Sequence, residues 1–98
     1  MKTYELMPTN NQKSFYGKAV VTVYDNGLQV LRSYNTDVAA IEPGGKIRRL
    51  WNGWSATTGK HIAAFAGIGK KEYLSLPYKP LEFMETFEPL ITAAAKIA

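Results

Sequence analysis

The chain has 98 residues, of which 46% are hydrophobic and 20% charged, a composition typical of one small globular domain and not of a disordered chain. It has no cysteine and one histidine, which excludes disulfide bonds and leaves too few ligands for a structural zinc site. No apolar run has the length of a signal peptide or of a membrane-spanning helix, so we expect a cytoplasmic domain with no membrane contact.

The formal net charge of +4 comes from the first 60 residues, because residues 61–98 contain equal numbers of lysines and glutamates. No acidic residue occurs between Glu42 and Glu72, and this interval contains six cationic residues and both tryptophans. Cationic and aromatic side chains in one segment are typical of proteins that bind nucleic acid.

Four short segments in the first half of the chain predict an antiparallel meander. In the first of them Ala19, Val21 and Val23 alternate with residues that would lie on the opposite face of a strand. Turn-forming residues separate the segments, among them Asp-Asn-Gly at 25–27 and Pro-Gly-Gly at 43–45. The predicted strands are residues 15–24, 28–34, 37–42 and 46–51.

The periodicity becomes helical after Trp54. Serine and threonine residues offer an N-cap and Gly67 a stop, which predicts a helix over residues 55–66. Residues 70–76 form a second, short helical segment that ends before Pro77. An apolar stripe predicts helix again near the C-terminus, where Pro89 either kinks the helix or starts a new one. The stripe comprises Phe83, Phe87, Leu90, Ile91 and Ala94.

The predicted fold class is therefore α+β, a small antiparallel sheet of four to five strands covered by C-terminal helices. We expect a single domain over residues 1–98, with an N-terminal extension at 1–12, the sheet at 13–54 and the helical part at 55–98. The C-terminal apolar stripe either closes the core of the sheet or forms a contact between two copies, so a homodimer remains open.

The candidate nucleic-acid-binding residues flank the last predicted strand. If the tryptophan rings and the guanidinium groups share an open surface, they provide stacking and charge together. If Trp51 is buried, that surface shrinks, and burial of at least one tryptophan is the usual outcome in a small domain. The candidate set is Lys46, Arg48, Arg49, Trp51, Trp54 and Lys60.

A candidate anion site lies at the N-terminus of the first predicted helix, because the backbone N–H groups and the helix dipole favour an anion there. The four candidate residues are Thr57, Thr58, Lys60 and His61. A nucleotide-hydrolysing phosphate loop does not fit, because five residues separate Gly53 from Gly59 and His61 follows Lys60. The hydroxyl groups also serve as simple helix caps.

We expect no catalytic residue, no metal site and no cofactor. The alternative of a small hydrolase would use His61 as the base and Ser55, Thr57 or Thr58 as the nucleophile, but no sequence motif directs a carboxylate to the histidine.

Four ordered blocks carry a resemblance: residues 13–19, 31–39, 52–62 together with Phe65, and 74–77. They resemble a family of small uncharacterised proteins carried by phages and mobile elements of Gram-positive bacteria, over about residues 13–77. The resemblance implies an accessory protein in the bacterial cytoplasm, with nucleic acid or a host protein as its partner.

The sequence thus favours a non-enzymatic module that binds nucleic acid through a basic and aromatic patch. The alternative is a protein–protein interaction module, such as an inhibitor of a host defence factor, that uses the same surface or the face marked by Glu82, Glu85 and Glu88.

Overall fold

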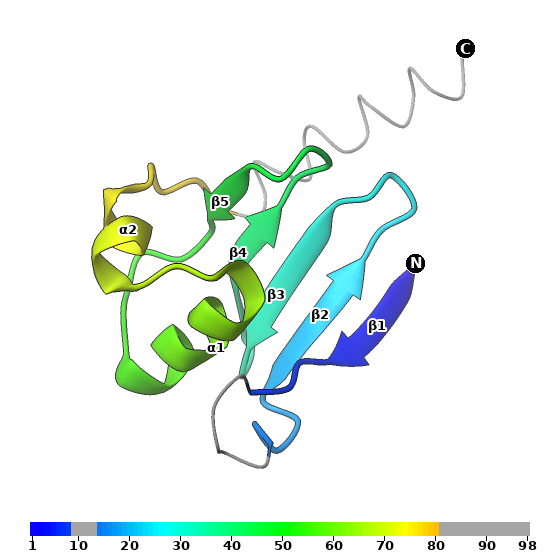
Figure 1. The fold of residues 1–98 in the computed structure, drawn as a ribbon, viewed down its shortest axis with the longest axis horizontal. Coiled ribbons are helices and arrows are strands. Elements are labelled where there is room, and N and C mark those ends of the chain that lie inside the picture. Colours follow the sequence, from blue (N-terminus) through cyan, green and yellow to red (C-terminus); the bar gives the residue numbers. More distant parts are fainter. Residues whose placement is uncertain (9–13, 81–98) are drawn as a thin grey trace.

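The structure is a computed structural model of the chain, and it describes residues 1–8 and 14–80. Five strands precede two helices in these residues (Figure 1). The strands form one antiparallel sheet in the order β1-β2-β3-β4-β5, so each strand pairs with its neighbour in sequence. The elements are β1 (Lys2–Glu5), β2 (Ala19–Val23), β3 (Gln29–Ser33), β4 (Thr36–Ile41), β5 (Ile47–Arg49), α1 (Ala56–Ala66) and α2 (Lys70–Ser75). The predicted α+β meander is confirmed, and the helix predicted from the stripe beginning at Phe83 lies outside the described residues.

Strand β1 was not predicted, because residues 1–12 were expected to be an extension. It pairs antiparallel with β2, and Lys2 lies opposite Val23 while Glu5 lies opposite Val20. All four residues of β1 are exposed, so the segment lacks the apolar alternation that reveals a half-buried strand in a sequence. The sheet therefore has five strands, within the predicted four to five, and β1 is an exposed strand at its edge.

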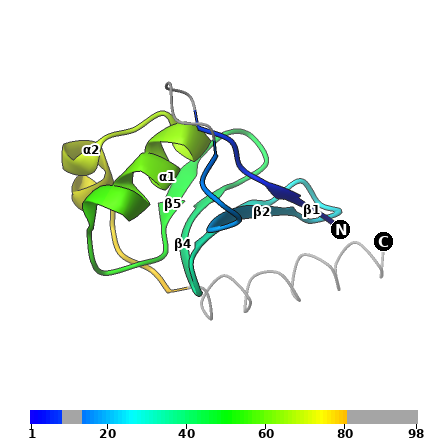
Figure 2. The ribbon, with the colours of Figure 1, turned by 90° about the horizontal axis from the view of Figure 1, so that it is seen from below.

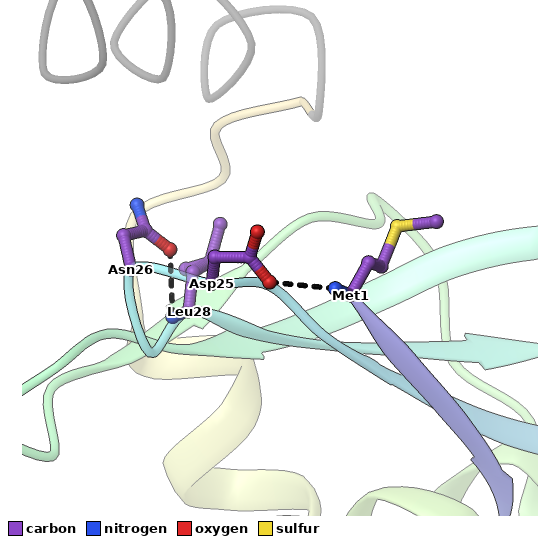
Figure 3. Close-up of polar contacts among 4 residues, drawn as sticks. All are labelled: Met1, Asp25, Asn26 and Leu28. Carbon is purple, nitrogen blue, oxygen red and sulfur yellow. Dashed lines mark hydrogen bonds and ion pairs between the residues drawn. The ribbon is translucent and has the colours of Figure 1, made fainter. Parts of the chain in front are cut away.

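The turn between β2 and β3 forms at Asp25-Asn26-Gly27, as predicted. Gly27 has φ 94, and its N–H donates to the carbonyl of Tyr24 at 2.9 Å. Asn26 Oδ1 accepts from the N–H of Leu28 at 3.0 Å (Figure 3). The terminal ammonium group of Met1 pairs with Asp25 Oδ1 at 2.6 Å and lowers the pKa of that carboxyl. Because both partners are exposed, this ion pair contributes little to stability.

The main core lies between the sheet and the helices, which Figure 2 shows on the same side of the sheet. Ile62 of α1 and Tyr73 of α2 are fully buried in one cluster with Val21 and Leu31. A register shift between β3 and β4 next to Leu31 also brings Val38 into this cluster, as a β-bulge does. A second, smaller cluster contains Leu28, Val30, Ala40 and Leu50.

Helix α1 begins and ends where the sequence predicts. The hydroxyl of its N-cap, Ser55, accepts from the N–H of Thr58 at 3.1 Å. At the other end Gly67 adopts φ 73 and its N–H donates to the carbonyl of Ala63 at 2.9 Å. These two caps fix the ends of α1 and therefore which of its side chains face the sheet.

Candidate functional site

Arg48 and Arg49 occupy consecutive positions of β5 and therefore point to opposite faces of the sheet. The Arg48 side chain is only 13% exposed, and its Nη1 atom lies 3.3 Å from Glu42 Oε2 in an ion pair. The prediction that both guanidinium groups share an open surface is not met, because strand alternation separates them.

Arg49 binds backbone carbonyl groups around α2. Its Nε atom donates to the Trp51 carbonyl at 3.1 Å, and its Nη1 atom donates to the carbonyls of Leu74 and Leu76 at 3.3 and 3.2 Å. The guanidinium carbon lies 5.4 Å from the centre of the Tyr73 ring. Arg49 therefore joins β5 to α2, and the three acceptors that it binds within the described residues are neutral carbonyl groups.

The two tryptophans pack against the main core and do not form a free stacking surface. The Trp51 ring covers Gly53 so closely that a Cβ atom there would lie 2.7 Å from the ring. The Trp54 ring covers Gly59 of α1 in the same way, and its centre lies 5.7 Å from that of Tyr73. Their aromatic area stabilises the junction between sheet and helices, which corrects the predicted basic and aromatic patch.

A groove does lie along β5, between that strand and the segment after α2. Arg49 and Tyr78 form a parallel bridge, and the N–H of Lys79 donates to the Arg49 carbonyl at 3.0 Å. The cavity has a volume of about 80 Å³. We call it the β5 groove; its lining comprises the cationic Lys46, Arg48, Arg49 and Lys79 and the apolar Ile47, Leu76 and Pro77. Three residues of the predicted patch thus meet at this groove, while the tryptophans and Lys60 are not among its lining residues.

The four residues of the predicted anion site do not gather at the start of α1. Thr57 and Lys60 are exposed, whereas Thr58 and His61 are buried against the sheet. Ser33 Oγ of β3 lies 2.9 Å from Thr58 Oγ1 and 2.8 Å from His61 Nδ1. The helical period accounts for the split, because adjacent positions on a helix point in different directions.

Ser33, Thr58 and His61, here called the Ser33 cluster, form a buried polar contact between β3 and α1. The His61 ring lies 4.5 Å from that of Phe15 and 5.9 Å from that of Tyr34, measured between ring centres. Burial lowers the pKa of His61 and favours the neutral imidazole. A serine hydroxyl beside an imidazole contains the two groups of a nucleophile–base pair. Ser33 and His61 are only 2% and 1% exposed, however, so their contact packs α1 against β3.

The sequence interpretation missed two exposed tyrosines at one end of the sheet. Tyr16 and Tyr34 lie in tight turns and have φ 53 and φ 56, the non-glycine residues with positive φ in the described part of the chain. A turn signal was present, since Tyr16 precedes Gly17 and Tyr34 precedes Asn35, but the sequence interpretation placed both tyrosines in predicted strands. This turn at Tyr16 also explains why β2 begins at Ala19 and not at Phe15.

The model of the family described as "Family of unknown function (DUF8033)" matches residues 3–78 of the chain. The chain belongs to this family. The DUF8033 match extends from β1 to the bridge at Tyr78, so it includes the Ser33 cluster, both exposed tyrosines and every lining residue of the β5 groove except Lys79. No curated protein and no solved structure matches the chain.

Residues 1–8 and 14–80 contain neither a candidate metal site nor a membrane-spanning helix. No group of three or more histidine, cysteine, aspartate or glutamate side chains is placed to hold a metal ion in these residues. None of the helices described here is both long and apolar enough to cross a membrane.

Proposed function

We propose that this DUF8033 chain is a non-enzymatic module that binds the phosphate backbone of nucleic acid along the β5 groove. The observation that carries the proposal is a groove along β5 whose lining includes four cationic residues, although strand alternation directs the guanidinium groups of Arg48 and Arg49 to opposite faces. Glu42 offsets the charge of Arg48, whereas the charge of Arg49 faces neutral carbonyl groups. Among the described residues, the charges of Lys46 and Arg49 therefore give the groove a cationic surplus next to an edge strand, which is a suitable surface for phosphate groups.

The charge of the rest of the described chain supports the same class of ligand. Residues 1–8 and 14–80 contain ten lysine and arginine side chains and five carboxylates. One of these carboxylates, Asp25, is held by the terminal ammonium group. A nucleic acid that approaches the groove therefore meets a positive domain, which raises its association rate. We further propose that the protein acts in the bacterial cytoplasm, as an accessory protein of a phage or mobile element of Gram-positive bacteria.

The test is a fluorescence anisotropy titration of the full chain with a labelled 20-nucleotide single strand and its duplex at 50 and 200 mM salt. We expect the dissociation constant to rise steeply with salt, because each neutralised phosphate contributes about 0.7–0.9 to the logarithmic slope. Lys46→Ala is expected to lower this slope by about 1, because Lys46 lines the groove. Lys2→Ala, an exposed lysine on the distant strand β1, is the matched control. Binding that does not depend on salt, or that Lys46→Ala leaves unchanged, contradicts the proposal.

The exposed edge of β1 favours a second candidate, a module that binds a protein by strand addition. The N–H of Leu6 donates to the Ala19 carbonyl at 2.8 Å. Because backbone groups alternate along an antiparallel pair, those of Thr3 and Glu5 point away from β2. Thr3→Pro removes an outward N–H and should abolish capture of a host protein from a nuclease-treated lysate, while Lys46→Ala should leave that capture unchanged.

A further inference from the structure

Two tight turns lie side by side at the end of the sheet where β2 begins and β3 ends (Figure 1). In the first, the N–H of Lys18 donates to the Phe15 carbonyl at 3.0 Å. In the second, Tyr34 and Asn35 connect paired residues of β3 and β4. The N–H of Tyr34 donates to the Lys18 carbonyl at 2.8 Å and so joins the two turns. Each turn presents one tyrosine, Tyr16 or Tyr34.

Both tyrosines adopt a backbone conformation that disfavours bulky residues. Tyr16 has φ 53 and is followed by Gly17 with φ 73, which is the type I′ geometry that prefers asparagine followed by glycine. Tyr34, with φ 56, occupies the first central position of a two-residue hairpin loop, where glycine or asparagine is favoured. Asparagine at either position would avoid the conformational cost, so the tyrosine rings need another explanation.

Burial accounts for neither ring in full, although the Tyr34 ring lies 5.9 Å from that of His61, measured between ring centres. Tyr16 is 73% exposed and Tyr34 is 48% exposed. Their backbones are nevertheless held firmly, because the N–H of Tyr16 donates to Ser14 Oγ at 2.9 Å and the next N–H, of Gly17, donates to Glu5 Oε1 at 2.8 Å. A strained backbone position that carries a large exposed ring is typical of a binding surface.

We propose that Tyr16 and Tyr34 form a stacking platform for unpaired bases, a role that depends on the nucleic-acid binding proposed above. Lys18 Nζ lies 5.3 Å from the centre of the Tyr34 ring and adds positive charge beside the platform. Exposed rings beside a cation bind the faces of bases with little dependence on sequence. A protein partner fits less well, because the described domain is strongly cationic and Lys18 is exposed at this surface.

The platform and the β5 groove are separate surfaces. Tyr34 precedes β4 at one end, and Lys46 follows the turn at the opposite end of that strand. The six residues of β4 span roughly 20 Å at about 3.3 Å per residue. Substitutions at one surface therefore leave the other intact, and duplex, which has no unpaired bases, should engage the groove alone.

The test uses the double variant Tyr16→Asn/Tyr34→Asn of the full chain, with labelled 12-nucleotide oligo(dT), oligo(rU) and a blunt duplex as probes. Because asparagine tolerates positive φ, we expect the melting temperature to be at least that of the wild type. Affinity for the single strands should fall about 5- to 150-fold per stacked base, with the duplex affinity unchanged. The DNA and RNA arms show which single strand the platform prefers. Tyr4→Asn, which removes an exposed tyrosine from β1, is the matched control.

The outcomes separate the two proposals. Wild-type affinity of the double variant for single strands, with salt-dependent binding retained, overturns the platform and leaves the groove. Equal losses of affinity for single strands and duplex also overturn the platform. The variant Tyr16→Phe/Tyr34→Phe keeps both rings, so the platform is also overturned if this variant binds single strands more weakly than the wild type. If the wild-type chain binds none of the probes at low salt, both proposals are overturned. If the two tyrosines are required for capture of a protein and no oligonucleotide binds, the surface is a protein-binding surface and the platform is overturned.

Discussion

The Tyr73 hydroxyl offers the sharpest test of how the helices are held on the sheet. The Tyr73 side chain is fully buried, and its hydroxyl lies 2.7 Å from the Val38 carbonyl and 3.1 Å from the Trp51 carbonyl. A phenol has a single hydrogen, so the shorter contact is the main hydrogen bond. Tyr73→Phe removes this bond and retains the ring.

The expected cost follows from what remains at the two carbonyl groups. The Val38 carbonyl still accepts from the N–H of Leu50 at 3.1 Å, and the Trp51 carbonyl still accepts from Arg49 Nε at 3.1 Å. Neither acceptor is left unsatisfied, so Tyr73→Phe should lower the free energy of unfolding by about 1 kcal/mol, the net value of one buried hydrogen bond. For a domain of this size the melting temperature should fall by about 4–8 °C.

The assay is urea denaturation followed by tryptophan fluorescence and circular dichroism, with the m-value compared between variants. Tyr73→Ala is the reference for loss of the ring and should cost about 3–5 kcal/mol. A Tyr73→Phe variant that is as stable as the wild type, or one as unstable as Tyr73→Ala, is incompatible with a hydroxyl group that contributes one buried hydrogen bond.

Three further predictions concern the same core. Gly59→Ala should lower the melting temperature although alanine favours helices, because the Trp54 ring occupies the space of the new methyl group. Gly69→Ala, with open space around it, is the control. Equal stability of the two variants would contradict this prediction. Because burial lowers the pKa of His61 below 6.5, the folded state loses stability as the pH falls from about 6.5 through that lowered pKa. The urea midpoint of unfolding should therefore fall between pH 7.5 and pH 5, and it should fall less in His61→Gln than in the wild type. Burial raises the pKa of Tyr73 from 10 to about 12, so the stability that the neutral hydroxyl contributes is intact below pH 10 and is lost as the pH rises through 12. Alkaline titration of unfolding should show this loss of stability in the wild type and not in Tyr73→Phe.

The periodic and turn-forming parts of the fold were predictable from local signals. Alternation predicted β2, and Asp25-Asn26-Gly27 predicted the turn to β3. Ser55 and Gly67 marked both ends of α1, since capping is decided by residues close in sequence. β1 escaped prediction because its exposed residues contact solvent on both faces and so impose no apolar pattern.

The candidate site was only partly predictable, because it depends on contacts between distant residues. The sequence identified Lys46, Arg48 and Arg49, but not that Glu42 pairs with one arginine and carbonyl groups around α2 bind the other. The Ser33 contact with His61 joins residues 28 positions apart, which no local pattern reveals. The sequence likewise did not determine to which face of the sheet each side chain of the three-residue strand β5 points.

The most direct test of the central claim, that the β5 groove binds nucleic acid, is a titration of amide chemical shifts in the ¹⁵N-labelled full chain with a 12-nucleotide single strand at 50 mM salt. If the β5 groove binds the strand, the amides in β5 and at Leu76, Tyr78 and Lys79 should shift at 50 mM salt, and these shifts should disappear at 500 mM salt. Unchanged shifts in these segments at 50 mM salt, with or without changes elsewhere in the chain, would contradict it.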